Sequence, residues 1–317
     1  MQTTYSIPVL DLEDYLSGQP ERQLAFVQGV GSALREVGFF ALTRHQISHD
    51  LIQKSYQQLA TLFAMSPEQK SSFEIAGLKG QRGYTSFGKE HAKDSKAPDL
   101  KEFWHVGQEP DASVPTLLSY PPNVWPSDLP EFKSTMTEVF SRLETCALAI
   151  LEACALYIKQ DVTLIRDMAV HGNSILRLIH YPPIPSDSHP ASIRAAAHED
   201  INLITLLIEA TASGLEILGR DGKWIPVTTP KECIIVDAGD MLQNLTNGFF
   251  KSTTHRVVNP NNSRERRYSM PFFVHARGEV ALDPLDCCIE ATGGIQEFPN
   301  IKADAYLMQR LKEIGLA

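Results

Sequence analysis

Three residues whose side chains commonly bind metal ions stand in the second half of the chain: His198, Asp200 and His255. Residues i and i+2 of a β-strand point to the same face, so a strand over 198–200 would bring an imidazole and a carboxylate together. His255 falls in a second strand-like run, STTHRVV, which a folded sheet can lay over the first. Two histidines and one carboxylate leave three coordination positions open, which suits non-haem Fe(II) that must bind a cosubstrate and dioxygen. The same ligands also suit catalytic zinc.

Arg267 and Ser269 stand two positions apart in the run RYSMPFFVH. On a strand they share a face, and a guanidinium beside a hydroxyl is suited to bind a carboxylate, bidentately in the case of arginine. The alternative is that Arg267 belongs to a solvated basic cluster with Arg264 and Arg266. The metal-ligand pattern that precedes it favours an anion site beside the metal.

The elements that must position these residues are predicted to be strands. From about residue 174 the chain alternates short apolar runs with turn residues: SILRLIHY, INLITLLIE, LEIL, KWIPV, CIIVD, STTHRVV and RYSMPFFVH. Asp221-Gly222 predicts a hairpin with a type I′ turn, in which both central residues have φ > 0. Strands that follow one another with little helix between them indicate antiparallel pairing, and hence a jelly roll.

The rest of the chain is predicted to be mainly helical. Apolar spacing predicts helices at about 20–37, 48–63 and 128–158, and a terminal helix at 303–315. The long third helix is expected to back the sheet, and the terminal helix to pack on the N-terminal helices. Residues 76–100 have no clear period and predict a long loop.

Composition bounds the fold and the partners. The chain has 317 residues, 43% hydrophobic and 21% charged, which is ordinary for a globular protein. We expect one principal domain over 1–317, of mixed α+β class with a mainly β core. The formal net charge of -9 and the pI near 5.6 argue against nucleic acid and anionic membrane as partners.

Targeting features are not evident. The five cysteines form no C-x-x-C pair and are expected to be thiols in a reducing compartment. The N-terminal segment MQTTYSIPVLDLEDYL lacks a basic stretch followed by an apolar one, and no uncharged apolar stretch reaches membrane-spanning length. We therefore expect a cytoplasmic protein.

Several segments resemble one known family. HEDINLITLLIE, GLEILGRDGKWIPV, DAGDMLQNLTNGFFKSTTHRVVNP and RRYSMPFF are similar to the isopenicillin N synthase-like branch of the 2-oxoglutarate/Fe(II) dioxygenases. The resemblance extends to IPVLDL near the N-terminus, GFF at 38–40, RGY at 82–84 and KEFWHVG at 101–107, so it covers nearly the whole chain. It implies a distorted double-stranded β-helix flanked by helices, with an N-terminal region at 1–120 and a catalytic core at 174–280.

The resemblance also implies roles for single residues. It implies that iron is bound by His198, Asp200 and His255, that the distal carboxylate of 2-oxoglutarate is held by Arg267 and Ser269, and that Tyr181 contacts this cosubstrate. Many plant members have Asn-Tyr-Tyr-Pro where this chain has Ile-His-Tyr-Pro at 179–182, so the usual asparagine contact is missing. His180 alternates in facing with Tyr181 and is expected to be a core or rim histidine.

Four aromatic side chains are expected to line a substrate pocket. Tyr84, Phe103 and Trp104 are assigned from the layout of the family's N-terminal region, and Phe273 from its place in an apolar strand near the anion site.

The expected activity is oxidation, most simply hydroxylation, of a small organic substrate, with release of succinate and carbon dioxide. One alternative is an Fe(II) oxidase of the isopenicillin N synthase or aminocyclopropanecarboxylate oxidase type, which shares these motifs and uses no 2-oxoglutarate. Others are a non-catalytic metal-binding protein on the same scaffold and a zinc hydrolase. A zinc hydrolase leaves Arg267 and Ser269 without a role.

Overall fold

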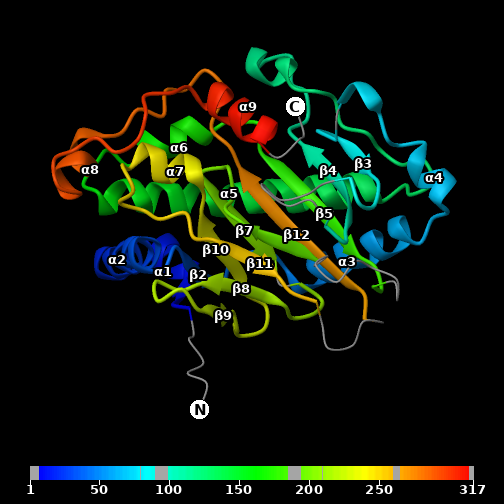
Figure 1. Cartoon of the computed structure of the whole chain (residues 1–317), viewed down its shortest axis with the longest axis horizontal. Helices are drawn as coiled ribbons and strands as arrows, with labels where there is room; N and C mark the ends of the chain where they lie inside the picture. Colours follow the sequence, from blue (N-terminus) through cyan, green and yellow to red (C-terminus); the bar gives the residue numbers. More distant parts are fainter. Residues whose placement is uncertain are drawn as a thin grey trace.

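A computed structural model describes residues 7–78, 80–89, 99–184, 194–208, 210–259 and 265–313. Two β-sheets face each other, and helices cover the outer side of the larger one (Figure 1). The larger sheet has eight strands in the order β1-β2-β10-β7-β12-β5-β4-β3, and the smaller has four in the order β6-β11-β8-β9.

The strands of the larger sheet are β1 (Val9–Asp11), β2 (Phe39–Thr43), β3 (Gly83–Thr85), β4 (Glu102–Gly107), β5 (Ile175–Tyr181), β7 (Ile204–Ile208), β10 (Ile234–Ala238) and β12 (Arg267–Val274). Those of the smaller sheet are β6 (Ala195–His198), β8 (Leu215–Leu218), β9 (Trp224–Pro226) and β11 (His255–Val257). Neighbouring strands are antiparallel except for β1 and β2, which are parallel. The predicted jelly roll is confirmed.

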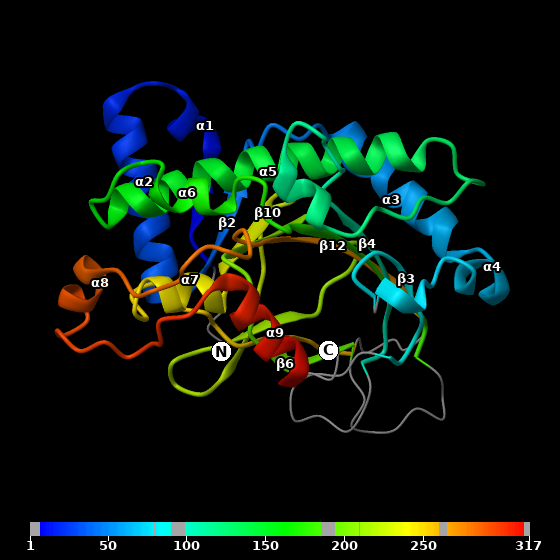
Figure 2. The ribbon, with the colours of Figure 1, turned by 90° about the horizontal axis from the view of Figure 1, so that it is seen from above.

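The helices are α1 (Leu12–Leu16), α2 (Pro20–Glu36), α3 (His49–Phe63), α4 (Pro67–Ser71), α5 (Phe132–Tyr157), α6 (Leu164–Ala169), α7 (Asp240–Leu245), α8 (Asp286–Ala291) and α9 (Ala303–Glu313). Figure 2 shows α2, α3 and α5 as a layer on one side of the larger sheet, with the smaller sheet on the other. The predicted helices at 20–37 and 48–63 correspond to α2 and α3, and that at 128–158 to α5, which begins a few residues later. No helix in the described part of the chain is long and apolar enough to span a membrane.

The larger sheet has two chemically different faces because side chains alternate along a strand. On β5, Leu176 and Leu178 belong to the core that packs on the helices. On the same side, the ring of Phe272 from β12 contacts that of Phe140 from α5, with ring centroids 4.9 Å apart. Toward the smaller sheet, a separate apolar cluster contains Phe103, Ile179 and Tyr181. The space between the two sheets is therefore lined by alternate residues of β4, β5 and β12.

Two local predictions were wrong. Residues 76–100, predicted to be a loop, contain the strand β3, while residues 79 and 90–98 lie outside the described part of the chain. The terminal helix α9 does not pack on the N-terminal helices: both figures place it away from α1 and α2, and Arg310 pairs with Asp240 of α7 at 3.0 Å. It packs against α7 because Arg310 forms an ion pair with the buried carboxylate of Asp240. No sequence pattern predicts this pair.

The Asp221-Gly222 hairpin joins β8 and β9 as predicted, but its turn is of another type. Only Gly222 has a positive φ, 75°, and its N–H donates to the carbonyl oxygen of Gly219 at 2.9 Å. The N–H of Gly219 in turn donates to the carbonyl of Lys223 at 2.8 Å. This is a three-residue loop in which a glycine in the left-handed region follows a type I turn.

Candidate active site

The structure brings His198, Asp200 and His255 together between the two sheets. His198 ends β6, His255 begins β11, and the two are directly paired across these antiparallel strands. One ligand atom from each of the three residues lies within 4.8 Å of the others. Asp200 and His255 are buried, and about a third of the His198 side chain, 34%, is exposed. The cluster is thus enclosed on the protein side and open at His198.

The backbone orients both imidazoles. The Nδ1 atom of His198 lies 2.7 Å from the carbonyl oxygen of Ala196, and Nδ1 of His255 lies 3.1 Å from that of Thr253. A carbonyl oxygen can only accept, so Nδ1 carries the proton in each ring. The lone pair is therefore on Nε2, which in both residues faces Asp200. This is the tautomer that a metal ligand needs.

Asp200 does not lie on a strand, contrary to the reasoning from residues i and i+2. It lies in the loop between β6 and β7, where the N–H of Asp240 donates to its carbonyl oxygen at 2.7 Å. The N–H of Met241 similarly holds the carbonyl of Asn202 at 3.0 Å. The start of α7 therefore fixes the loop. Behind the carboxylate, the Thr205 hydroxyl donates to Oδ2 of Asp200.

The surroundings favour the neutral forms of His198 and His275. Burial and the neighbouring His255 lower the pKa of His198 to about 4. Burial likewise lowers the pKa of His275, which follows β12, to about 4. Asp237 on β10 is buried near Asp200, and burial together with that charge raises its pKa well above the usual value. A cation at the cluster would relieve this crowding of carboxylates.

Arg267 and Ser269 share the inner face of β12, as predicted, and Tyr181 is the residue of β5 paired with Arg267. All three are buried, at 2%, 3% and 3% exposure. The guanidinium carbon of Arg267 lies 5.0 Å from the ring centre of Tyr181, and its Nε donates to the carbonyl of Ala212 at 3.0 Å. Its Nη1 is buried and has no hydrogen-bond partner among the residues that the structure describes. A buried cation with an unused donor is expected to bind an anion.

A second arginine, missed at the sequence level, flanks the same tyrosine. The guanidinium carbon of Arg194 lies 5.8 Å from the ring centre of Tyr181, and burial together with the charge of Arg267 lowers the pKa of Arg194. Arg194 donates to the carbonyl oxygen of Glu265, close to the start of β12. This end of the cavity is therefore strongly cationic. Arg264 lies outside the described residues.

Of the four predicted pocket residues, Phe103 and Phe273 lie on the cavity face of the larger sheet. Trp104 lies on the opposite face, where its ring meets that of Phe132 from α5 at 5.7 Å. Tyr84 is paired with Trp104 and shares that face, so the predicted pocket positions of Tyr84 and Trp104 are wrong.

The hydroxyl of Tyr84 donates to Glu102, which also pairs with Nδ1 of His180 at 2.7 Å. His180 is thus a hydrogen-bonded core residue, as expected, and it faces away from the cavity, opposite to its neighbour Tyr181.

Two further polar residues of the cavity were not singled out from the sequence. Thr205 is one, and Arg177 on β5 is the other. Arg177 shares a strand face with Tyr181, and a charged residue inside the apolar run SILRLIHY was a usable indication.

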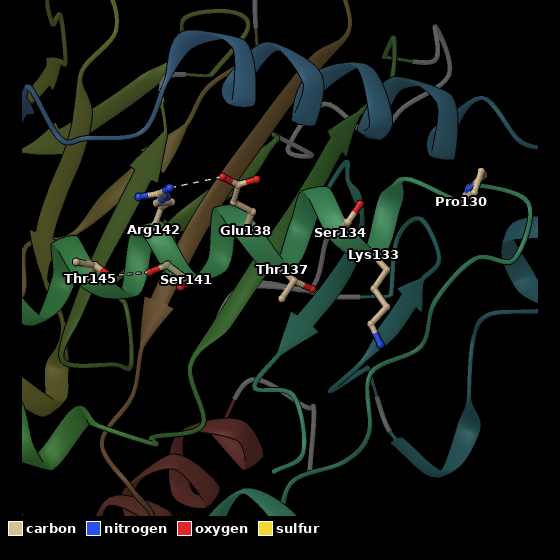
Figure 3. A pocket seen from close by; sticks show the side chains of 8 residues that line it. All are labelled: Pro130, Lys133, Ser134, Thr137, Glu138, Ser141, Arg142 and Thr145. Atoms are coloured by element: carbon tan, nitrogen blue, oxygen red, sulfur yellow. Dashed lines mark hydrogen bonds and ion pairs between the residues drawn. The ribbon is translucent and has the colours of Figure 1, made fainter.

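A groove elsewhere on the surface is unrelated to this cluster. It runs along the solvent-facing side of α5 (Figure 3) and is lined by Pro130, Lys133, Ser134, Thr137, Glu138, Ser141, Arg142 and Thr145. Its charged residues Glu138 and Arg142 pair with each other at 3.7 Å. Since α5 separates it from the sheets, it has no part in the chemistry of the cavity.

Two family models match the chain. Residues 7–128 match the N-terminal region of the non-haem dioxygenases in morphine synthesis, and residues 172–276 match the 2OG-Fe(II) oxygenase superfamily. The second match contains all of the cavity residues from β5 to the end of β12.

Similar proteins agree with these matches. A 2-oxoglutarate-Fe(II) type oxidoreductase of Aspergillus fumigatus is 31% identical over 84% of this chain and 81% of its own. The solved structure of a 2OG-Fe(II) oxygenase family protein from Caulobacter crescentus is 38% identical, covering 97% of this chain and 99% of its own, with a TM-score of 0.85. A full-length Neurospora crassa protein, solved in complex with alpha-KG and thymine, is 27% identical, covering 98% of both chains, with a TM-score of 0.86. The chain therefore belongs to the 2OG-Fe(II) oxygenase superfamily and is a non-haem, 2-oxoglutarate- and Fe(II)-dependent oxygenase.

Proposed function

We propose that His198, Asp200 and His255 hold Fe(II), that Arg267 and Ser269 hold the distal carboxylate of 2-oxoglutarate, and that the enzyme hydroxylates a small organic molecule. The observation that carries this proposal is the convergence of three ligand atoms within 4.8 Å, in the same cavity as a buried arginine with an unused donor.

The donor set fits iron. Two imidazoles with Nε2 available and one carboxylate occupy one side of an ion and leave three positions for other ligands. The carbonyls behind Nδ1 and the Thr205 hydroxyl behind Asp200 are the outer contacts that orient metal ligands.

The site at Arg267 and Ser269 fits one carboxylate of a dicarboxylate. A carboxylate placed against Nη1 of Arg267 would supply the hydrogen-bond acceptor that this buried group lacks. Ser269 is on the same strand face and offers a hydroxyl, while Tyr181 lies beside both and is proposed to contact the cosubstrate.

When iron and 2-oxoglutarate are bound, they supply oxidative decarboxylation of the cosubstrate to succinate and carbon dioxide, coupled to oxidation of a substrate carbon. The chain's own residues orient the bound groups and exclude water from the cavity. Phe39 places its ring against that of His255, with centroids 5.5 Å apart, so an apolar group lies beside this ligand. Phe103 and Phe273 are proposed to line the substrate pocket, where apolar walls strengthen polar contacts.

A small substrate is supported by the relatives, since the similar Neurospora crassa protein was solved with thymine. We propose residues 174–280 as the catalytic core, with residues 1–120 as an N-terminal region that covers it. A cytoplasmic location is supported by the five cysteines, all of which are free thiols.

The test is anaerobic addition of 2-oxoglutarate to the Fe(II)-loaded protein. Chelation of the metal by the keto acid gives a weak visible charge-transfer band, which is expected in the wild type, absent in His198→Ala and weakened in Arg267→Ala. Arg142→Ala, on the exposed side of α5, is the control and should retain the band. Iron binding without a band, and without succinate release in air, would instead support the oxidase alternative.

A further inference from the structure

The strand that carries His198 lies at the edge of its sheet. The His198 side chain is 34% exposed, against 10% for that of His255. The strand of His255, β11, lies between β6 and β8, whereas β6 has only β11 beside it in the described part of the chain. Backbone groups on the outer side of an edge strand have no strand partner. The position of His198 therefore depends on contacts other than those of the sheet.

Ala196 is the residue of β6 through which His198 is oriented. Its carbonyl oxygen accepts the hydrogen bond from Nδ1 of His198 at 2.7 Å, which leaves Nε2 facing Asp200. A shift of this carbonyl would turn the imidazole, because the hydrogen bond at one ring nitrogen sets the direction of the other. A contact that fixes the backbone of Ala196 therefore also fixes a proposed metal ligand.

Asp99 provides such a contact from a distant part of the chain. Its Oδ1 accepts a hydrogen bond from the N–H of Ala196 at 3.1 Å, 97 positions away in sequence. A carboxylate is a stronger acceptor for a backbone N–H than a neutral oxygen is. Asp99 precedes β4 of the larger sheet, so this bond joins that sheet to the edge strand of the smaller one. Two hydrogen bonds thus connect Asp99 to His198 through Ala196.

The carboxylate of Asp99 is itself held in place. Its second oxygen, Oδ2, accepts from the ammonium group of Lys101 at 2.8 Å. Both side chains are buried, with 6% of Asp99 and 8% of Lys101 exposed. A buried ion pair resists separation, because each charge alone would be poorly solvated. Neither residue is among the proposed iron ligands or cosubstrate contacts.

We propose that Asp99 is a positioning residue for the metal: by holding the N–H of Ala196, it fixes the carbonyl that orients His198. The inference rests on the proposed function, because it takes His198 as an iron ligand. It gives the segment before β4 a part in the metal site of the catalytic core. Losing an outer contact to a metal ligand lowers metal affinity by about 10- to 100-fold.

The test compares two neutral replacements of Asp99 in a Lys101→Met background, in which neither charge of the pair is left buried alone. Asp99→Asn keeps an oxygen that can accept from Ala196, whereas Asp99→Ala removes it. Affinity for Fe(II) and Co(II) is measured anaerobically by competition with a chromophoric chelator. Asp99→Asn is expected to bind both ions like the Lys101→Met parent, and Asp99→Ala about tenfold more weakly.

Asp161→Ala is the control. It removes an exposed aspartate between α5 and α6 that also accepts a backbone N–H, from Thr163 at 2.9 Å, and it should bind metal like the wild type. Asp99→Leu, which fills the volume without an acceptor, replaces Asp99→Ala if that variant does not fold. If Lys101→Met does not fold, the same comparison is made in the wild-type background.

Equal metal affinity in the Asp99→Asn and Asp99→Ala variants overturns the proposal, whether that affinity equals the parent's or lies below it. The 2-oxoglutarate charge-transfer band of the wild type is recorded alongside. If the wild type binds no iron or gives no band, the proposed function itself has failed. If the band is present and the two Asp99 variants bind metal equally, only the role of Asp99 has failed.

Discussion

His198 and His255 lie directly opposite each other on neighbouring strands, with their ring centroids 4.4 Å apart. Their Nε2 atoms are 3.7 and 3.8 Å from the same oxygen of Asp200. Both distances are too long for hydrogen bonds, so no bond among the three side chains has to break before an ion can bind. In the described part of the chain, the hydrogen bonds to these three side chains come from behind the cluster.

The hydroxyl behind Asp200 gives the first prediction. Thr205→Val keeps the shape and the strand preference of the side chain and removes the donor to Asp200. We expect the affinity for Fe(II) or Co(II) to fall about tenfold, the usual effect of losing an outer contact to a metal ligand. Competition with a chromophoric chelator measures it. Thr61→Val, on the exposed side of α3, is the control, and equal affinity in Thr205→Val and the wild type would show that the hydroxyl does not orient Asp200.

The sequence predicted the site correctly where two residues lie on the same strand, because alternation along the strand fixes which face they share. Arg267 and Ser269 lie on β12, which covers all but the last residue of the run RYSMPFFVH, so their common facing followed from alternation alone. For Asp200 the residue was correctly placed beside His198, but the reason was wrong, because the loop geometry depends on the start of α7, which is distant in sequence.

The pocket prediction failed for a different physical reason. Every residue of β4 is buried, so the run EFWHVG has no polar side to show which face meets the helices and which meets the cavity. Phe103 and Trp104 are equally apolar neighbours on opposite faces. What separates them is packing against distant residues, such as that of Trp104 against Phe132 of α5.

The unused donor of Arg267 gives a second prediction. Arg267→Gln removes the cation proposed to pair with the distal carboxylate, and we expect affinity for 2-oxoglutarate to fall at least about 30-fold, since losing a buried charge pair costs ~2 kcal/mol or more. Ser269→Ala removes one neutral hydrogen bond and should cost only about fivefold. Titration of the charge-transfer band measures both.

Arg266→Gln is the matched control for this prediction because Arg266 is the adjacent, exposed arginine. It should bind 2-oxoglutarate like the wild type. An equal loss in the Arg266 and Arg267 variants would indicate that a diffuse basic cluster, rather than one buried side chain, attracts the cosubstrate.

His275 gives a prediction for the pH dependence of stability. Burial lowers its pKa from 6.5 to about 4, so between these pH values the unfolded chain binds a proton that the folded protein does not. The free energy of unfolding therefore falls as the pH decreases through this window. We expect His275 to account for a loss of about 2 kcal/mol between pH 7 and pH 5 in the metal-free protein.

Urea denaturation at several pH values, with and without His275→Asn, measures this contribution. The variant should lose less stability on acidification than the wild type, although His198 contributes in the same direction. His171→Asn, which removes an exposed imidazole, is the control. An unchanged pH slope in His275→Asn would mean that this imidazole is not buried in neutral form.

Glu102, on the helix-facing side of β4, gives a last prediction. Its carboxylate accepts from Lys70 at 2.8 Å, from the hydroxyl of Tyr84 and from His180 at 2.7 Å. Burial opposes its ionisation, but these hydrogen bonds outweigh burial and hold the pKa of Glu102 below the usual value. The network joins α4 and β3 to β5.

Glu102→Gln leaves the charge of Lys70 buried without its partner, and Lys70 is only 9% exposed. Removing one member of a buried ion pair costs about 3 kcal/mol or more in unfolding free energy, because the remaining charge is poorly solvated. Glu138→Gln breaks an exposed pair on α5 and should change stability by less than about 0.5 kcal/mol. Urea denaturation distinguishes the two. If both variants are equally stable, water reaches Lys70 in the folded protein, and the network does not fix α4 and β3 to β5.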